Sequence, residues 1–166
     1  MSTLAVDSIT NATGTAAINI DSAGRVTMPN RPAFFAGRTG GNTALTLGTF
    51  PMDQTLYNVG NHYNTSTYRF TAPIAGLYHF HAQLYYNSGA GQYRVHFRKN
   101  GGNNIMTGST NATGNDESLN ISINTQLAVG DYIELYSDQG VSRTLFYFIN
   151  GTPHGPHTYF EGYLIG

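Results

Sequence analysis

The most informative stretch of this chain is Phe70-Thr71-Ala72-Pro73-Ile74-Ala75-Gly76-Leu77-Tyr78-His79-Phe80. The proline and glycine in its middle separate two runs of β-forming residues, which predicts a strand, a corner and a second strand. Two further segments accompany it: Asn58-Val59-Gly60-Asn61-His62-Tyr63 before it and Leu127-Ala128-Val129-Gly130-Asp131-Tyr132 after it. The first contains Gly and Asn and the second Gly and Asp, residues typical of tight turns between strands.

Composition favours a single β-rich domain. The chain has 166 residues, of which 40% are hydrophobic and only 10% are charged, enough for one hydrophobic core and too few for two. Twenty glycines and twelve tyrosines indicate many short strands and turns. Alternation over residues 93–98, 119–123 and 132–136 places every second side chain on one face. These patterns predict an all-β sandwich.

Charge, cysteine content and hydrophobic runs argue against a nucleic-acid partner, a disulfide framework and a membrane segment. The net charge is −1 and Lys99 is the sole lysine, so no basic field would gather nucleic acid. The chain has no cysteine, so its stability must come from burial rather than from disulfides. The first residues lack a basic and apolar leader, and no later run reaches 18 apolar residues. We expect no signal peptide and no membrane insertion.

The three quoted segments resemble the signature of the complement component 1q globular head, a relative of the tumour necrosis factor fold. The resemblance covers Pro32 to Gly166. It implies a ten-stranded jelly-roll sandwich that works as a homotrimer. We therefore divide the chain into an extended N-terminal arm, residues 1–31, and a jelly-roll head, residues 32–166.

The arm differs from the head because the first 32 residues contain no aromatic side chain. The turn Asp21-Ser22-Ala23-Gly24 joins residues 17–20 to residues 25–29 and predicts one isolated hairpin. A lone hairpin is marginal in water, so we expect partner chains or a larger assembly to order it. The arm is similar to the stem regions that precede globular heads in structural proteins of tailed bacteriophages.

Alternation also predicts which side chains meet other subunits. After Gly76 the expected core residues are Tyr78, Phe80, Ala82 and Leu84, and the intervening residues point outward. The strand after Asp131 and the last strand show the same pattern. In the related folds these strands share an inner sheet that faces the threefold axis, and tyrosine suits such interfaces. The resemblance thus implies a trimer interface of His79, His81, Tyr85, Tyr132, Glu134, Tyr136, Tyr159, Glu161 and Tyr163. The alternative is that these tyrosines cover a sheet exposed to water.

We expect no enzyme and no cofactor. The sequence lacks a Gly-x-Ser-x-Gly elbow, a His-Glu-x-x-His motif, a phosphate loop and a cysteine nucleophile. The pair His154 and His157 has metal-like spacing, yet a surface loop before the last strand is favoured. Asp116-Glu117 would suit calcium, although no matching ligand pattern appears. Glu134 and Glu161 could supply the two carboxylates of a glycosidase, but both are predicted at the subunit interface rather than in a cleft.

A receptor-binding surface is predicted on the outer sheet. Arg94, His96 and Arg98 are expected to form an exposed row that would contact anionic sugars or phosphates. The neighbouring loop carries Asn103 and Asn104, and adaptable amide side chains suit carbohydrate. A plain solvated charged face is the alternative.

Two function classes follow. In the first, the chain is a non-enzymatic trimeric virion structural protein of a tailed bacteriophage, in a fibre, tail or capsid surface. It would be assembled in the host cytoplasm, with the arm bound to other virion proteins and the head facing a host-surface glycan. In the second, it is a free carbohydrate- or protein-binding jelly-roll module. A docking arm favours the first class, since a free lectin would not need one.

Overall fold

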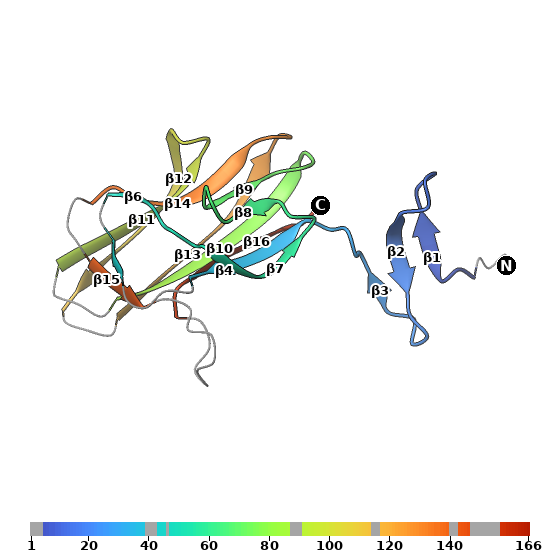
Figure 1. The fold of residues 1–166 in the computed structure, drawn as a ribbon, viewed down its shortest axis with the longest axis horizontal. Coiled ribbons are helices and arrows are strands. Elements are labelled where there is room, and N and C mark those ends of the chain that lie inside the picture. Colours follow the sequence, from blue (N-terminus) through green and yellow to red (C-terminus); the bar gives the residue numbers. More distant parts are fainter. Residues whose placement is uncertain are drawn as a thin grey trace.

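The computed structural model describes residues 5–38, 43–45, 47–86, 91–113, 117–139, 143–146 and 157–166. In this part of the chain every regular element is a β-strand, and the strands form three sheets. Two of the sheets stack as a sandwich, and the third, at the N-terminal end, stands apart from them (Figure 1). The prediction of an all-β jelly-roll sandwich is confirmed.

The larger sheet of the sandwich has seven strands arranged around β10. Its strands are β10 (Gly76–Tyr86), β13 (Glu117–Leu127), β16 (Tyr159–Leu164), β4 (Ala33–Gly37), β7 (Gln54–Val59), β15 (Arg143–Phe146) and β5 (Thr43–Leu45). Along most of its length β10 pairs with β13 on one side and β16 on the other, and β16 continues to β4 and β7. The C-terminal end of β10 pairs with β15, which pairs with β5. All these pairings are antiparallel.

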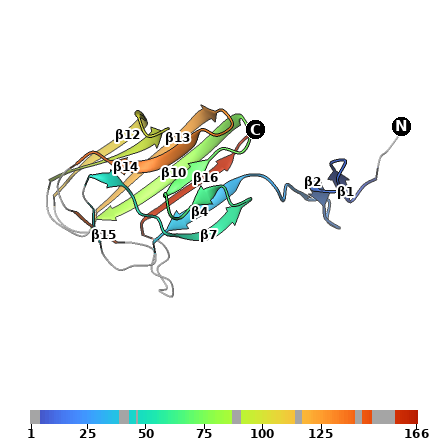
Figure 2. The same ribbon diagram turned by 45° about the horizontal axis from the view of Figure 1, so that its top comes forward.

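The second sheet of the sandwich has six strands. They are β12 (Asn103–Ala112), β11 (Gly91–Lys99), β14 (Tyr132–Ser137), β9 (Arg69–Thr71), β8 (Tyr63–Asn64) and β6 (Gly48–Thr49). The first five follow one another in that order, and β6 pairs with β14. Figure 2 shows this sheet, with β12 and β14, lying over the sheet of β10 and β16. Several head strands are only two or three residues long, so the expected ten strands appear as a larger number of short segments.

The arm contains its own small sheet. Its strands are β1 (Ser8–Thr10), β2 (Ala16–Ile20) and β3 (Val26–Thr27), in that order. The hairpin expected around residues 21–24 is β2–β3, and the Asp21 carboxylate accepts hydrogen bonds from the Ala23 and Arg25 amides within its turn. Strand β1 was not predicted from the sequence. Its turn is held similarly, because the Asn11 side chain accepts from the Thr13 and Thr15 amides.

The core lies between the two sheets of the sandwich and is rich in aromatic rings. All four residues predicted to face inward from β10 are fully buried, which confirms the alternation: Tyr78, Phe80, Ala82 and Leu84. Phe34 of β4 stacks on Phe70 of β9 with ring centroids 5.0 Å apart, so this contact joins the two sheets. Phe34 also meets Phe160 edge-on at 4.8 Å. Such ring pairs add to the stabilisation that burial itself supplies.

Residues 70–80 and 127–132 meet at one end of the sandwich. The Ala72 amide donates to the Asp131 carbonyl at 2.8 Å, and the Gly130 amide donates to the Ala72 carbonyl at 2.9 Å. The Asp131 carboxylate accepts from Lys99, Asn100 and the Ala128 amide. These contacts, the Lys99 hydrogen bond first, lower the pKa of Asp131 to about 2. The corner at Pro73 and the turn before β14 are therefore tied together.

Residues 58–63 form a turn between β7 and β8. Asn58 closes it on both sides, because its side chain donates to the Tyr63 carbonyl at 2.8 Å and accepts from the Tyr63 amide at 3.0 Å. Gly60 and Asn61 adopt φ of 75° and 58°, the left-handed conformation that favours these two residue types. The Tyr63 hydroxyl reaches the Met52 carbonyl, and burial raises the pKa of Tyr63. The turn thereby anchors a core ring.

We predict that Gly162→Ala destabilises the head by about 1–3 kcal/mol, the usual cost of overpacking a core. A Cβ at this position would lie 2.5 Å from Phe80 Cδ1 and 2.9 Å from Phe34 Cε1. Urea unfolding at one fixed protein concentration would measure the change. Gly102→Ala is the control, because a Cβ there meets nothing within 4 Å. Equal unfolding midpoints for the two variants would contradict the packing described here.

Candidate functional site: the outward faces of the two sheets

The outward face of the seven-stranded sheet carries an aromatic layer, which we call the aromatic face. Strand register places side chains of four neighbouring strands on this side. They are Phe35 of β4, Tyr57 of β7, His79, His81, Gln83 and Tyr85 of β10, and Tyr159, Glu161 and Tyr163 of β16. On the β13 side the layer ends, because the residues opposite His79 and His81 are Asn124 and Ser122.

Rings pack against one another across the aromatic face. Phe35 stacks on Tyr159 with centroids 4.9 Å apart, and Tyr57 lies 6.1 Å from Phe35. The two histidine rings also contact tyrosines: the ring centroids of His81 and Tyr159 lie 5.4 Å apart, and those of His79 and Tyr163 lie 5.2 Å apart. Tyr57 and Tyr163 are 46% and 45% exposed, so the layer reaches solvent in the single chain.

The carboxylate of Glu161 is the acidic group within this layer. His81 Nδ1 lies 3.3 Å from Glu161 Oε1, across the β10–β16 pair. Burial raises the pKa of both Tyr57 and Tyr159, and the charge of Glu161 raises each of them further. Both phenols are therefore neutral hydrogen-bond donors at physiological pH.

All nine interface residues were predicted to share one face, and the structure places six of them on the aromatic face. They are His79, His81, Tyr85, Tyr159, Glu161 and Tyr163. Phe35 and Tyr57 were missed. The doublet Phe34-Phe35 was the available signal, because alternation sends one of the two rings into the core and the other outward. That these residues form a subunit interface remains a prediction.

The prediction that β14 shares a sheet with β10 and β16 is wrong. Strand β14 pairs with β11 and β9 in the six-stranded sheet, so Tyr132, Glu134 and Tyr136 lie on the opposite side of the molecule from Glu161. Alternation assigns each residue to the inside or the outside of the sandwich but does not say which sheet the strand joins. Glu134 and Glu161 therefore do not form the carboxylate pair considered from the sequence.

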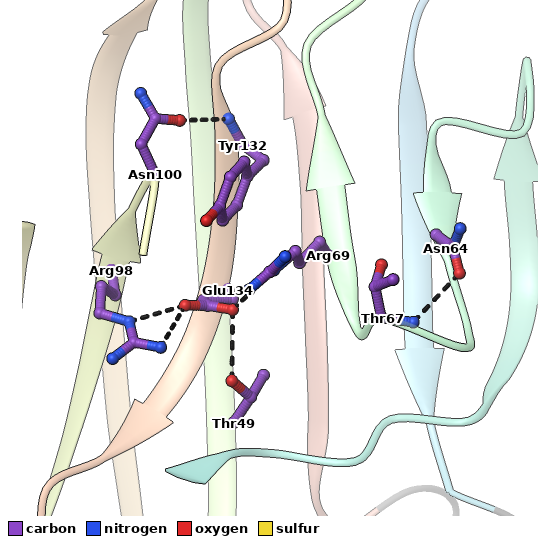
Figure 3. Close-up of polar contacts among 8 residues, drawn as sticks. All are labelled: Thr49, Asn64, Thr67, Arg69, Arg98, Asn100, Tyr132 and Glu134. Carbon is purple, nitrogen blue, oxygen red and sulfur yellow. Dashed lines mark hydrogen bonds and ion pairs between the residues drawn. The ribbon is translucent and has the colours of Figure 1, made fainter. Parts of the chain in front are cut away.

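Glu134 is instead the centre of a salt-bridged network on the outward side of the six-stranded sheet, which we call the ion-pair face (Figure 3). Its side chain is fully buried. Arg98 donates to Oε1 from Nε at 2.6 Å and from Nη2 at 2.5 Å, and Arg69 Nε donates to Oε2 at 2.8 Å. Thr49 adds a hydroxyl donor at 3.2 Å. The carboxylate thus joins strands β6, β9, β11 and β14.

Tyrosine rings complete this network. The Arg98 guanidinium lies 3.4 Å from the centroid of the Tyr136 ring, and the Arg69 guanidinium lies 4.3 Å from that of Tyr132. Cation–π contacts of this kind stabilise cations that are partly removed from water. Asn100 accepts from the Tyr132 amide at 2.9 Å and holds the start of β14, as Figure 3 also shows.

The predicted receptor row lies on the same face but is not a row of free cations. Arg94 and His96 both face Asp138, with nitrogen-to-oxygen distances of 3.1 and 3.3 Å, and His96 is 4% exposed. His96 also contacts the Thr107 hydroxyl at 2.8 Å, and Arg98 is paired with Glu134. The expectation that all three side chains stand exposed was wrong, because Glu134 of β14 and Asp138, directly after β14, bring carboxylates to them. Asn103 and Asn104 are exposed as expected.

Two metal sites were considered from the sequence. His154 and Asp116 lie outside the described residues, so neither site is tested. Within the described residues, no three His, Cys, Asp or Glu side chains gather closely enough to hold a metal ion. The same part of the chain contains no helix that is long and apolar enough to cross a membrane.

Two packed antiparallel sheets, with one aromatic and one salt-bridged outward face, define a jelly-roll head domain. The chain belongs to the C1q domain family, whose profile matches residues 33–165. No curated protein sequence matches it.

Solved structures show the same fold at low sequence identity. The globular domain of the zebrafish complement 1qA protein has a TM-score of 0.65 and 17% identity, covering 82% of this chain and 98% of that one. Eiger TNF from S. frugiperda gives 0.64 and 13%, covering 83% and 94%. Murine APRIL at pH 5.0 gives 0.60 and 12%, covering 81% and 99%. The fold prediction is therefore confirmed, and these likenesses concern the fold alone.

We predict that Glu134→Gln lowers the free energy of unfolding by about 3 kcal/mol. The change leaves Arg98 without its carboxylate in a place that is only 17% exposed, and breaking a buried pair costs more than breaking a surface one. Urea unfolding measures the effect. Asp21→Asn is the control, because its pair with Arg25 is exposed and should change stability little. Similar losses in both variants would contradict a structural role for the Glu134 network.

Proposed function

We propose that the protein is a non-enzymatic binding module that works as a homotrimer, with the aromatic face of the seven-stranded sheet as the contact between subunits. The observation that carries this proposal is the contrast between the two outward faces. At the centre of the ion-pair face, the buried Glu134 carboxylate is paired within the chain by Arg69 and Arg98. The aromatic face instead leaves large rings such as Tyr57 and Tyr163 half exposed.

Burial of these rings would stabilise a subunit interface. Aromatic side chains are enriched in interface cores because they remove much apolar area from water while a phenol hydroxyl still finds a partner. Tyr57 and Tyr159 are already packed against Phe35 in the single chain, so these rings lose little side-chain freedom on association. A surface of this kind on one sheet suits a closed cyclic assembly, in which each subunit presents the same residues.

We predict that light scattering coupled to size exclusion reports about three times the 18.0 kDa chain mass at micromolar concentration. Tyr163→Glu should convert the trimer to monomers, because it introduces a charge into the aromatic face of each subunit. Ser109→Glu is the matched control, since Ser109 is exposed on the opposite sheet beside Arg94. A monomeric wild type, or a trimer that Tyr163→Glu leaves intact, would overturn the proposal.

We further propose that the trimer is a structural protein of a tailed-bacteriophage virion, in a fibre, tail or capsid surface. The support is the arm, which resembles virion stem regions and whose sheet has no buried core of its own. In this arrangement the arm binds other virion proteins and the head faces a host-surface glycan. The polar side chains suited to such a glycan are Arg94, whose side chain is 40% exposed, and the exposed Asn103 and Asn104.

We predict that deletion of residues 1–31 leaves a trimeric head that is missing from purified particles, as measured by immunoblotting. The expected reason is that the strands of both sandwich sheets begin at Ala33, after the arm. Full-length chain on the particles is the control. Incorporation of the truncated chain would contradict docking through the arm. Glycan binding by a protein that never associates with particles would favour the alternative of a free carbohydrate- or protein-binding module.

A further inference from the structure

The register of the arm sheet gathers its aliphatic side chains on one side. Ile9 of β1 pairs with Ile18 of β2, and Ile20 of β2 pairs with Val26 of β3. Because Ile18 and Ile20 are two positions apart on one strand, all four side chains share a face of the sheet. We call these four residues the apolar arm face. Asp7 lies opposite Ile20 just before β1 and borders this face.

The other face of the same sheet is polar. Ser8, Asn19 and Thr27 stand opposite one another across the three strands. The Ser8 hydroxyl donates to the Asn19 side-chain oxygen at 3.0 Å. The arm sheet is therefore amphipathic, although its sequence is too short and too poor in aromatics to suggest a core.

The head of the same chain does not cover the apolar arm face. Ile9 is 48% exposed and Val26 is 57% exposed. Contacts between arm and head lie elsewhere, in the connector of residues 28–32. Arg31 Nε donates to the Leu164 carbonyl at 2.5 Å, and Asn30 donates back to the Ala16 carbonyl at 2.8 Å. A hollow at this joint is lined by Ala17, Met28, Asn30, Arg31, Pro32, Ile74, Leu164, Ile165 and Gly166.

The joint fixes where the arm leaves the head. Arg31 is bonded to the end of β16, and β4 begins two residues later beside it. Both strands belong to the sheet that carries the aromatic face. Residues 28–32 can span at most about 18 Å when fully extended. Each arm sheet therefore stays close to this end of the seven-stranded sheet. The aromatic face of that sheet is the proposed contact between subunits.

Trimer formation would consequently bring three identical apolar arm faces together. Short tethers give local concentrations on the order of millimolar, so weak contacts between the arms become favourable. A sheet with one apolar face is stabilised when that face packs against another element, and a second copy offers a face of matching size and chemistry.

We propose that the apolar arm face packs against the same face of two other copies, so that three arm sheets close a three-sided stem below the heads. The inference rests on the proposed homotrimer. In the stem, Ile9, Ile18, Ile20 and Val26 point inward and the polar face with Ser8, Asn19 and Thr27 points to solvent. The partner of this surface is thus the chain itself, and other virion proteins would meet the polar outside of the stem.

The absence of cysteine from the chain allows a direct test in the full-length protein. Single variants Ile9→Cys and Ser8→Cys place a thiol on the two opposite faces of β1 at adjacent positions. In a stem, a maleimide reagent should modify the thiol at position 9 at least about tenfold more slowly than the thiol at position 8. In urea the two rates should become equal. Adding Ile18→Asp to Ile9→Cys should restore fast modification while the mass stays trimeric.

The outcomes separate this inference from the proposed function. A trimeric mass with slow modification at position 9 and recovery in the Ile18→Asp background supports the stem. A trimeric mass with equal rates at positions 8 and 9 overturns the stem and leaves the proposed trimer of heads standing. That second result would also be expected if another virion protein covers the apolar arm face. A monomeric mass overturns both.

Discussion

The structure depends on strand β10, whose side chains must satisfy two environments at once. Tyr78, Phe80, Ala82 and Leu84 are all fully buried between the sheets. The residues between them are held on the opposite side because successive side chains of a strand alternate. Pairing with β13 and β16 on its two edges leaves β10 no freedom to change register. A shift by one residue would exchange the core with the outward residues.

This constraint produces two outward faces with different chemistry. On the seven-stranded sheet it brings His81 beside Glu161 and gathers rings from β4, β7, β10 and β16. On the six-stranded sheet the equivalent alternation brings Arg69 and Arg98 to Glu134, and the buried charge is compensated within the chain. One face is therefore complete in a single chain, and the other gains stability if a further protein surface covers it.

The arm repeats the same physical pattern on a smaller scale. Its sheet also has one apolar and one polar side, but it has no second sheet against which to pack. The Arg31 contact with Leu164 holds it near the sheet of the aromatic face. Head and arm are thus linked, and each presents a surface that one chain does not bury.

Features that depend on local chemistry could be predicted from the amino-acid sequence. Alternation around Tyr78 and Phe80 identified the core of β10, turn residues such as Gly130 and Asp131 marked the strand ends, and the family resemblance indicated the jelly roll. Which strands share a sheet could not be predicted in this way, because strand pairing joins segments far apart in the chain and leaves no period in the sequence. Glu134 illustrates the difference. Alternation along β14 predicted that its side chain faces out of the sandwich. Its burial between Arg69 and Arg98 follows from the pairing of β14 with β9 and β11, which local patterns do not contain.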